Sequence, residues 1–292
     1  MRTWSFAKGH GTLNDFVLVK DRSGMLNPSA QDVRFLCDRR GGIGGDGFLR
    51  AVKAENMPEW DGPGNRWFMD YRNADGSVAE MCGNGIRVFV RWLLEEDLAG
   101  GDVIEVATRA GLRRARVCRD GQISATMGTP YWSSEETWVR LGDREWHGHP
   151  VDVGNDHCVV RVTEEDLAGL DLTRPLELDG AVFPRGANVE FVVDLGPDEF
   201  RMRVLERGVG ETMSCGTGVV AASCDQRART GFSSTGRGDQ RLSAPGGEAC
   251  GSEHTAHVPG GILKVEFDTE GRASLTGPAV IVARGEVTLP DE

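Results

Sequence analysis

The sequence predicts a chain of two similar β-rich halves, each folded around one helix. The first observation is a repeated phrase, MCGNG at residues 81–85 and SCGTG at residues 214–218. The second is that an apolar run long enough for a helix follows each copy. The third is that the other apolar segments are short and separated by Gly, Asn and Pro. Because the copies stand about half a chain apart, we infer an internal duplication.

Short segments with alternating apolar residues or many β-branched residues are typical of strands. Such segments lie at residues 16–20, 103–108, 189–194, 201–206, 263–267 and 279–283. We expect the first buried helix over residues 86–101, ending at Gly100 and Gly101, and a shorter one over residues 219–228. Residues 52–67 and 231–261 are predicted to be loops, with His254 and His257 exposed to solvent in the second.

Composition narrows the class of protein. The 292 residues include 33 Lys and Arg against 45 Asp and Glu, a net charge of −12. This balance disfavours nucleic acid and anionic membrane surfaces as partners, so we expect a small-molecule substrate. The N-terminal stretch lacks the apolar core of a signal peptide, and no run of about 20 apolar residues could span a bilayer. We therefore expect a cytoplasmic protein with a sizeable core.

Cysteine usage agrees with a reducing compartment. The seven cysteines are an odd number at irregular spacings, and no CxxC pair occurs. This pattern does not indicate a disulfide framework or a zinc site, so we expect no metal.

One glycine-rich segment matches a known motif by its spacing alone. GIGGDG at residues 42–47 fits the G-x-G-x-x-G spacing of dinucleotide-binding proteins. It follows the charged FLCDRRG instead of a buried strand, and no amphipathic helix follows it. We do not expect a dinucleotide site here.

The repeated cysteine motif has a chemical interpretation. A cysteine in the first turn of a helix lies against free backbone N–H groups and the positive end of the helix dipole, which favours the thiolate. The small residues after it leave those N–H groups open to a carboxylate. A single motif would more often be a packed cysteine, because cysteine is commonly buried. Two matching copies favour a chemical role for these cysteines over packing alone.

If the two halves faced each other, two thiols would flank one α-carbon. One thiolate could remove the α-proton while the other thiol delivered a new one, which inverts the centre without a cofactor. The helix N-termini would stabilise the charge that develops on the carboxylate. The sequence therefore predicts a racemase or epimerase.

Eight stretches in order resemble the diaminopimelate epimerase family, over nearly the whole chain. They are KGHGTLNDFV (8–17), DRRGGIGGDG (38–47), RNADGSVAEMCGNGIRVF (72–89), GNDHCV (154–159), GANVEF (186–191), ERGVGETMSCGTG (206–218), VPGGILKV (258–265) and GPAVIVARGE (277–286). The cysteine motifs alone are shared more loosely with proline racemase-like enzymes.

The resemblance implies an α/β fold of the α+β type, with two pseudo-symmetric domains, each a mixed sheet or barrel wrapped around a central helix. It implies an N-terminal half over residues 1–127 and a C-terminal half over residues 128–277, with a final strand in 278–292 returning to the first half. The implied reaction interconverts LL- and meso-diaminopimelate for lysine and peptidoglycan synthesis, without pyridoxal phosphate or another cofactor. The family also implies a homodimer.

The resemblance also implies roles for individual residues. Cys82 and Cys215 would be the acid and base, supported by His157 and Glu206. The backbones of Gly83, Asn84, Gly216 and Thr217 would hold the reacting carboxylate. The set that grips the distal carboxylate and amino group would be Asn73, Asn155, Asn188 and Arg207, while Asn14 would lie near the reacting end.

Departures from the family pattern leave two alternatives open. Asp156 stands where the family usually has Pro, and Leu13 replaces a commonly small residue. These changes remove no catalytic group, but they are compatible with a paralogue of the same fold acting on another amino acid. A catalytically silent binding protein is the other alternative, against which the intact cysteine pair argues.

Overall fold

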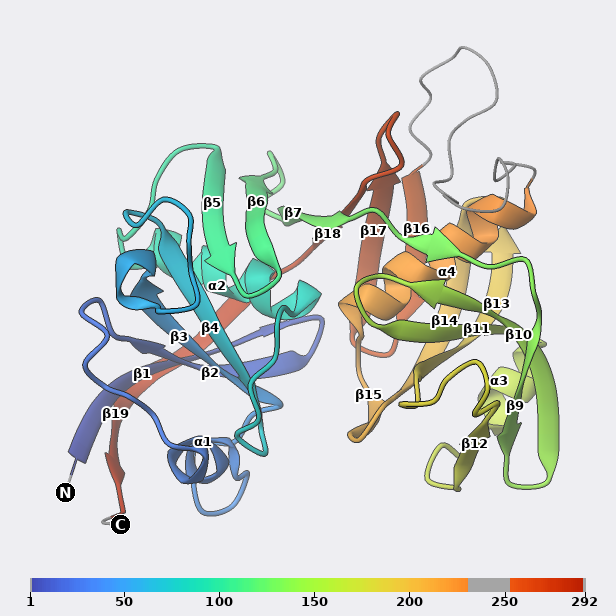
Figure 1. Ribbon diagram of the computed structural model, residues 1–292, viewed down its shortest axis with the longest axis horizontal. Coiled ribbons are helices and arrows are strands. Elements are labelled where there is room, and N and C mark those ends of the chain that lie inside the picture. Colours follow the sequence, from blue (N-terminus) through green and yellow to red (C-terminus); the bar gives the residue numbers. More distant parts are fainter. Residues whose placement is uncertain (1, 231–252, 291–292) are drawn as a thin grey trace. The chain divides into compact units, whose positions relative to one another are not determined.

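The computed structural model describes residues 2–230 and 253–290 and divides the chain into two compact units (Figure 1). The first unit comprises residues 1–125 and 277–292, and the second comprises residues 126–276. Each unit is a mixed sheet that surrounds one long helix, α2 in the first and α4 in the second. The predicted fold class is confirmed.

Among the described residues, the first unit contains two α-helices, one 3₁₀ turn and eight strands. In chain order these elements are β1 (Arg2–Gly11), β2 (Asn14–Lys20), α1 (Ala30–Cys37), β3 (Gly47–Lys53), η1 (Ala54–Asn56), β4 (Trp67–Asn73), α2 (Gly83–Glu95), β5 (Val103–Thr108), β6 (Gly111–Val117), β7 (Ile123–Gly128) and, from the far end of the chain, β19 (Val280–Leu289).

The second unit repeats this plan with extra short strands. Its elements are β8 (Tyr131–Trp132), β9 (Thr137–Leu141), β10 (Arg144–Asp152), β11 (Asp156–Arg161), α3 (Glu164–Gly169), β12 (Leu176–Leu178), β13 (Asn188–Gly196), β14 (Glu199–Glu206), β15 (Gly210–Thr212), α4 (Gly216–Arg229), β16 (Glu253–Val258), β17 (Gly261–Phe267) and β18 (Ala273–Gly277).

Strand pairing shows that the two units share one topology. From β1 to β7 the successive pairings are antiparallel, parallel, antiparallel, parallel, antiparallel and antiparallel. The series β10, β11, β13, β14, β16, β17 and β18 follows the same order of directions. The helix enters at the same step of each series, between β4 and β5 and between β14 and β16. The cysteine motifs therefore occupy corresponding places in the two units.

Helix α2 is buried because strands contact it from several sides. It packs against β1, β2, β3, β4, β6 and β19, and most of its side chains belong to the main core of the unit. The expected stop at Gly100 and Gly101 is wrong, because the helix ends at Glu95. Asp97 adopts a left-handed φ of 53°, and Leu98 N–H bonds to Leu93 O at 2.8 Å. This reversal is a Schellman motif, which Asp can form in place of Gly.

Helix α4 is held by one buried carboxylate as well as by apolar packing. Asp225 accepts hydrogen bonds from Trp132 Nε1 at 3.0 Å and from Arg161 Nη2 at 2.6 Å, and it contacts His149 Nδ1 at 3.1 Å. Burial alone would raise the pKa of Asp225, but the bonds from His149 and Arg161 lower it below the usual value. The buried charge thus ties α4 to β8, β10 and β11.

The β1–β2 hairpin turns through two residues with positive φ. Thr12 and Leu13 have φ values of 50° and 61°, a geometry that matches the twist of the flanking strands but is usually built from Asn-Gly. Leu13, noted above as a departure from the family pattern, is therefore in a strained conformation and 47% exposed. The turn places Asn14 at the first position of β2.

The loop predicted over residues 231–261 is partly corrected. Residues 231–252 lie outside the described part of the chain, but residues 253–258 form β16. His254 alternates inward on this strand, where it contacts Gln226 Oε1 at 3.0 Å and packs edge-on against Phe267. Burial lowers its pKa to about 4. The expectation that His254 is exposed is wrong, because a period of two on this strand buries alternate residues.

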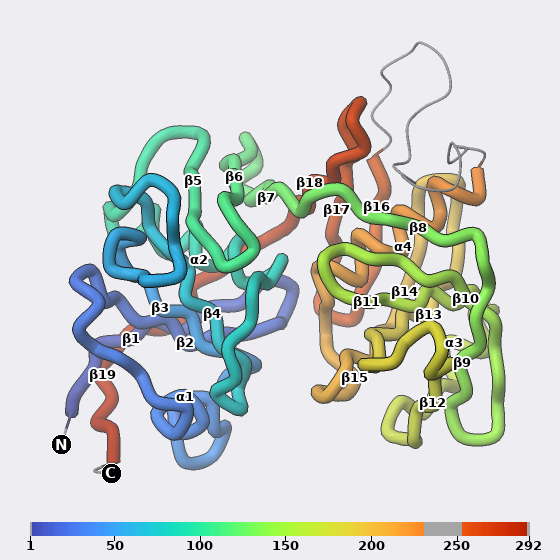
Figure 2. The backbone as a smooth tube through the Cα atoms, viewed as in Figure 1, coloured from blue at the N-terminus to red at the C-terminus, as the bar shows by residue number. Residues whose placement is uncertain are grey.

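Residues far apart in sequence complete the first unit. β19 pairs antiparallel with β1 from Arg2 opposite Leu289 to His10 opposite Val280, so the blue and red ends of the tube run side by side in Figure 2.

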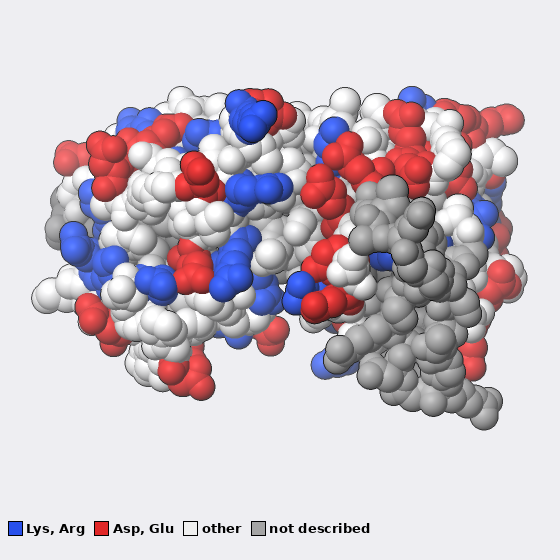
Figure 3. Space-filling model, turned by 90° about the horizontal axis from the view of Figure 1, so that it is seen from above, with Lys and Arg blue, Asp and Glu red and all other residues white. Residues whose placement is uncertain are grey.

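On the face seen in Figure 3, acidic and basic side chains of the described residues are interspersed. None of the described helices combines the length and the apolar content that crossing a membrane requires.

Candidate active site

In the first unit, Cys82 is the N-cap residue of α2. Its backbone is extended, with φ −139° and ψ 122°, and its Sγ accepts a hydrogen bond from Gly85 N–H at 3.3 Å. A Cβ at position 85 would lie 3.2 Å from Cys82 Cβ, so glycine lets the helix start close to the thiol. The sulfur thus lies at the positive end of the helix dipole, where a thiolate is favoured.

Asn14 links the β1–β2 hairpin to this helix start. Its Oδ1 accepts from Asn84 Nδ2 at 3.1 Å and lies 3.9 Å from Cys82 Sγ, while its Nδ2 donates to Asp46 Oδ2 at 2.9 Å. Asp46 comes from the GIGGDG motif that sequence analysis set aside. Burial, together with the charge of Asp15, raises the pKa of Asp46. Asp46, the aspartate of GIGGDG, therefore helps to hold the Asn14 side chain in place.

Asn73 is the last residue of β4, at the same end of the sheet as Asn14. Its Oδ1 accepts from Tyr71 Oη and its Nδ2 donates to Ser77 Oγ, each at 2.9 Å. The amide is therefore engaged within its own strand end and turn. Neither of these contacts joins Asn73 to Cys82 or Asn14.

In the second unit, Cys215 is the N-cap residue of α4 and is buried. Its Sγ lies 3.4 Å from Thr217 Oγ1. Burial raises the pKa of this thiol well above the usual value, and the charges of Glu206 and Glu190 raise it further. The hydroxyl of Thr217 and the backbone N–H of Gly218 act in the opposite direction. The second thiol therefore favours its protonated form.

The other site residues predicted in this unit lie at the strand ends beside α4. Asn155 precedes β11, His157 is its second residue, Asn188 begins β13 and Glu206 ends β14. His157 pairs in register with Asn188 across the two parallel strands. Its Nε2 meets Asn155 Oδ1 at 3.1 Å. The structure thus brings His157, Asn155 and Asn188 together.

Arg207 follows β14 and presents its guanidinium at the surface. Its N–H donates to Asn188 Oδ1 at 2.9 Å, and its Nη1 reaches the backbone oxygens of Arg185 and Gly186 at 3.3 and 3.5 Å. Within the described chain no carboxylate pairs with Arg207. Asp156, which replaces the family's usual Pro, lies 3.6 Å from Arg185 Nη2 instead.

A buried carboxyl group that the sequence did not predict acts on the second cysteine. Glu190, fully buried on β13, contacts His157 Nδ1 at 2.7 Å, and its Oε2 has no partner among the described residues. A Cβ at position 218 would lie 2.5 Å from Glu190 Oε1, so the second glycine of SCGTG makes room for this carboxyl group. The available signal was a charged residue within the apolar strand VEFVV, two positions after Asn188.

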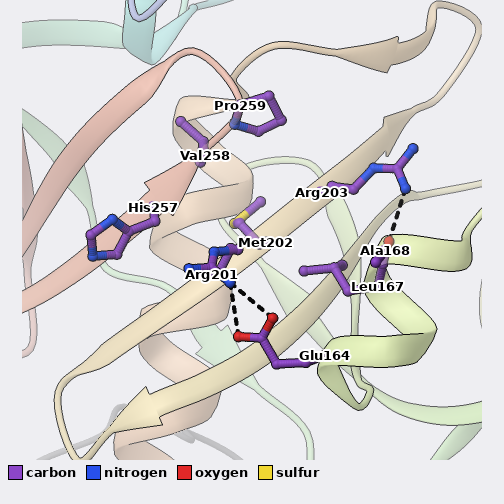
Figure 4. A pocket seen from close by; sticks show the side chains of 9 residues that line it. All are labelled: Glu164, Leu167, Ala168, Arg201, Met202, Arg203, His257, Val258 and Pro259. Carbon is purple, nitrogen blue, oxygen red and sulfur yellow. Dashed lines mark hydrogen bonds and ion pairs between the residues drawn. The ribbon is translucent and has the colours of Figure 1, made fainter.

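The second unit also has a surface pocket that is separate from the set of predicted site residues. It has a volume of about 470 Å³ and is lined by Leu167, Met202 and Val258, with an ion pair between Arg201 and Glu164 at 2.8 Å (Figure 4). No predicted site residue lines it. In the described ranges, no group of three or more His, Cys, Asp and Glu side chains is arranged to hold a metal ion.

Comparison with known proteins identifies the fold and then the family. The fold is shared with a PhzF-family phenazine biosynthesis protein from Bacillus anthracis, with a TM-score of 0.68, 14% identity and coverage of 99% of this chain and 100% of that one. Within this fold, the chain belongs to the diaminopimelate epimerase family, whose model matches residues 6–133 and 150–282.

Two curated relatives illustrate the similarity. The diaminopimelate epimerase of Streptomyces coelicolor is 43% identical over 284 residues, covering 97% of this chain and 94% of that protein. The diaminopimelate epimerase of Thermobifida fusca is 45% identical over 290 residues, covering 97% of this chain and 98% of the relative.

The contact between Gly218 and Glu190 gives a stability prediction. Gly218→Ala places a methyl group against a fully buried carboxyl group, and we expect it to lower the free energy of unfolding by roughly 1–3 kcal/mol. Gly169→Ala at the end of α3 is the matched control, because nothing lies within 4 Å of its Cβ position. Denaturant unfolding compares the two, and equal stability of both variants would contradict the packing argument.

Proposed function

We propose that this isomerase interconverts LL- and meso-diaminopimelate by proton transfer at one α-carbon, in lysine and peptidoglycan synthesis. The observation that carries the proposal is the placement of two thiols at corresponding helix starts in two units of the same topology. The names of relatives at 43% and 45% identity support the substrate.

In the proposed reaction, one cysteine is a thiolate and the other a thiol. The thiolate accepts the α-proton and becomes a thiol, while the opposite thiol gives its proton to the other face of the carbon and becomes a thiolate. Because the exchange leaves one thiolate and one thiol, the same groups can run the reaction in reverse. No cofactor enters this scheme.

The first peptide N–H groups of both helices would hold the reacting carboxylate. They belong to Gly83 and Asn84 in α2 and to Gly216 and Thr217 in α4. N–H groups in the first turn lack partners within the helix, so a carboxylate can accept from them. They would also stabilise the negative charge that develops as the α-proton leaves.

Supporting groups would orient the reacting atoms. His157 and Glu206 would contact the reacting amino group, with His157 held by Asn155 and Glu190, and Glu206 held by the hydroxyl of Thr212. Asn14 would position the helix start through Asn84. These bonds fix side chains whose orientation decides which proton moves.

The distal end of the substrate carries a second carboxylate and amino group. Arg207 offers a planar fork of donors suited to a carboxylate, and the amides of Asn73, Asn155 and Asn188 offer both donors and acceptors. An anchor of this kind favours diaminopimelate over simple amino acids, which lack the distal groups.

The two-thiol scheme predicts that epimerisation requires both cysteines. We expect Cys82→Ala and Cys215→Ala each to lower epimerisation by at least about 100-fold, because each face of the carbon loses its acid or base. The measurement is deuterium wash-in at the α-carbon with chiral analysis of the product. Cys118→Ser is the control, since Cys118 is partly exposed and has no role in the scheme. Near-normal epimerisation by either Ala variant would exclude the scheme.

The distal anchor predicts an effect on substrate binding. We expect Arg207→Gln to raise KM for diaminopimelate about tenfold or more, since one charge-assisted contact is lost. Arg185→Gln is the matched control, because Arg185 is its exposed neighbour and lacks a role in the anchor.

Assays of the unmodified chain on a panel of simpler amino acids should show little turnover. Faster turnover of any of them would instead favour a paralogue with another substrate.

We also propose a cytoplasmic homodimer. A reducing compartment keeps both thiols available, which the reaction requires. β19 pairs with β1 along one edge and exposes Val280 and Val282, at 44% and 55%, which offers an apolar strand surface to a second copy. Sedimentation analysis should give twice the chain mass of 31.7 kDa, and a single-chain mass at micromolar concentration would contradict the dimer.

A further inference from the structure

A buried arginine bonds to the two residues that follow the first cysteine. Arg87, on α2, is 0% exposed, and its Nη1 donates to Gly83 O at 2.9 Å while its Nη2 donates to Asn84 Oδ1 at 3.0 Å and to Thr12 Oγ1 at 3.4 Å. All three acceptors are neutral. Its Nε has no partner among the described residues, and none of their carboxylates pairs with the guanidinium.

A guanidinium in this position needs a counter-charge. Arginine keeps its proton in proteins, and burying a cation without an anion is costly. Burial lowers the pKa of Arg87 to about 10, and the charge interaction that opposes this lowering is with Cys82. Because Arg87 bonds to Gly83 O and Asn84, the residues directly after Cys82, its charge is fixed at the helix start that carries the thiol.

The surrounding backbone is shaped to admit this side chain. A Cβ at Gly11 would lie 3.1 Å from Arg87 Nη2, and the strained residue Thr12 supplies one of its acceptors. Positive φ at a β-branched residue costs free energy and persists where the surroundings hold it. The hairpin that carries Asn14 is therefore also built around the guanidinium.

We propose that Arg87 is the counter-charge of Cys82, so that the substrate-free chain carries a thiolate at Cys82 and a protonated thiol at Cys215. Arg87 touches no reacting atom in this scheme and acts through Cys82 as a positioning residue. The inference deepens the proposed function, and it rests on that function for its role in turnover. It implies that the epimer whose α-proton meets Cys82 reacts without prior movement of a proton between the thiols.

Several other charges around α2 are paired with one another. Asp15 bonds with Lys8 and Arg39, and Asp46 bonds with Arg39, so this cluster has equal numbers of acids and bases. The remaining charged or titratable groups lie on elements that contact α2. They are Arg2 and His10 on β1, Lys20 on β2, Arg50 and Lys53 on β3, Asp70, Tyr71 and Arg72 on β4, Arg113, Arg114 and Arg116 on β6, and Arg284 and Glu286 on β19. Arg2 pairs with Asp32. Arg50 and Arg72 pair with Asp70, and Arg284 pairs with Glu95 and Glu96.

The charged groups that act on Cys215, the thiol of α4, are negative, whereas Arg87 near Cys82 is positive. Burial and the carboxylates of Glu206 and Glu190 raise the pKa of Cys215, although His157 lies against Glu190. The other charged or titratable groups lie on strands that contact α4. They are Tyr131 on β8, Arg144, Glu145, His147, His149 and Asp152 on β10, Asp156, Cys158 and Arg161 on β11, Asp194 on β13, Glu253, His254 and His257 on β16, and Lys264 and Glu266 on β17. His149 and Arg161 are occupied by Asp225.

The test measures the protonation of each thiol without turnover. The full chain, free of substrate, is alkylated with iodoacetamide across pH 5–10, and peptide mass spectrometry follows Cys82 and Cys215 separately. We expect the alkylation midpoint of Cys82 to lie below the value of about 8.5 for a free cysteine, and that of Cys215 above it. A Cys82 midpoint at or above that of Cys215 would overturn the proposal, and this readout needs no variant.

Variants then assign the effect to Arg87. We expect Arg87→Gln to raise the Cys82 midpoint by at least one pH unit, a roughly tenfold loss of thiolate near neutral pH, and Arg87→Lys to restore most of it. Arg91→Gln removes a positive charge further along the same helix and should leave the midpoint unchanged. Circular dichroism confirms that each variant is folded. An unmoved midpoint in folded Arg87→Gln would overturn the proposal.

Deuterium wash-in with diaminopimelate on the same samples separates this inference from the proposed function. Wash-in by the unmodified chain together with an Arg87-independent midpoint would remove the role of Arg87 and leave the epimerase intact. Absence of wash-in together with an Arg87-dependent midpoint would remove the proposed reaction and leave the charge pairing intact.

Discussion

The start of a buried helix imposes the constraint on which both units are built. The first peptide N–H groups of α2 and α4 have no acceptor within their own helices, and the surrounding strands exclude much of the water that could supply one. In α2 the sulfur of Cys82 accepts one of these bonds, from Gly85. The remaining donors need an anion or a polar side chain. A carboxylate substrate meets this need, so the same feature that fixes the thiol also defines what binds beside it.

Shared topology does not make the two units chemically equal. Strand directions and helix positions correspond along the two matched series of seven strands, yet the charges that act on the two thiols differ in sign. The guanidinium of Arg87 bonds to the two residues after Cys82, whereas the carboxylates of Glu206 and Glu190 raise the pKa of Cys215. Duplication therefore supplies two thiols in the same local backbone, and the side chains around them set which one holds the proton.

The sequence was sufficient to predict the two halves, the central helices and six strand segments, because their signals are local. Periodicity marks a strand, and the repeated motif marks a helix start. Arg87 and Glu190 could not be predicted in the same way. Each lies within an apolar run, and its importance depends on which strand or loop faces it across the fold. The β16 strand was missed because its Gly- and Ser-rich flank has a loop's composition, although the position of His254 is decided by pairing with β17.

The pairing of β19 with β1 also bears on the order of assembly during synthesis. Residues 126–276 form a continuous segment that contains every strand of its own unit, so this unit can complete its sheet as soon as it leaves the ribosome. Residues 1–125 emerge earlier but lack an edge strand until residues 280–289 follow. The half of the chain made first is thus the half finished last, and its exposed β1 edge is open to misplaced pairing in the interval.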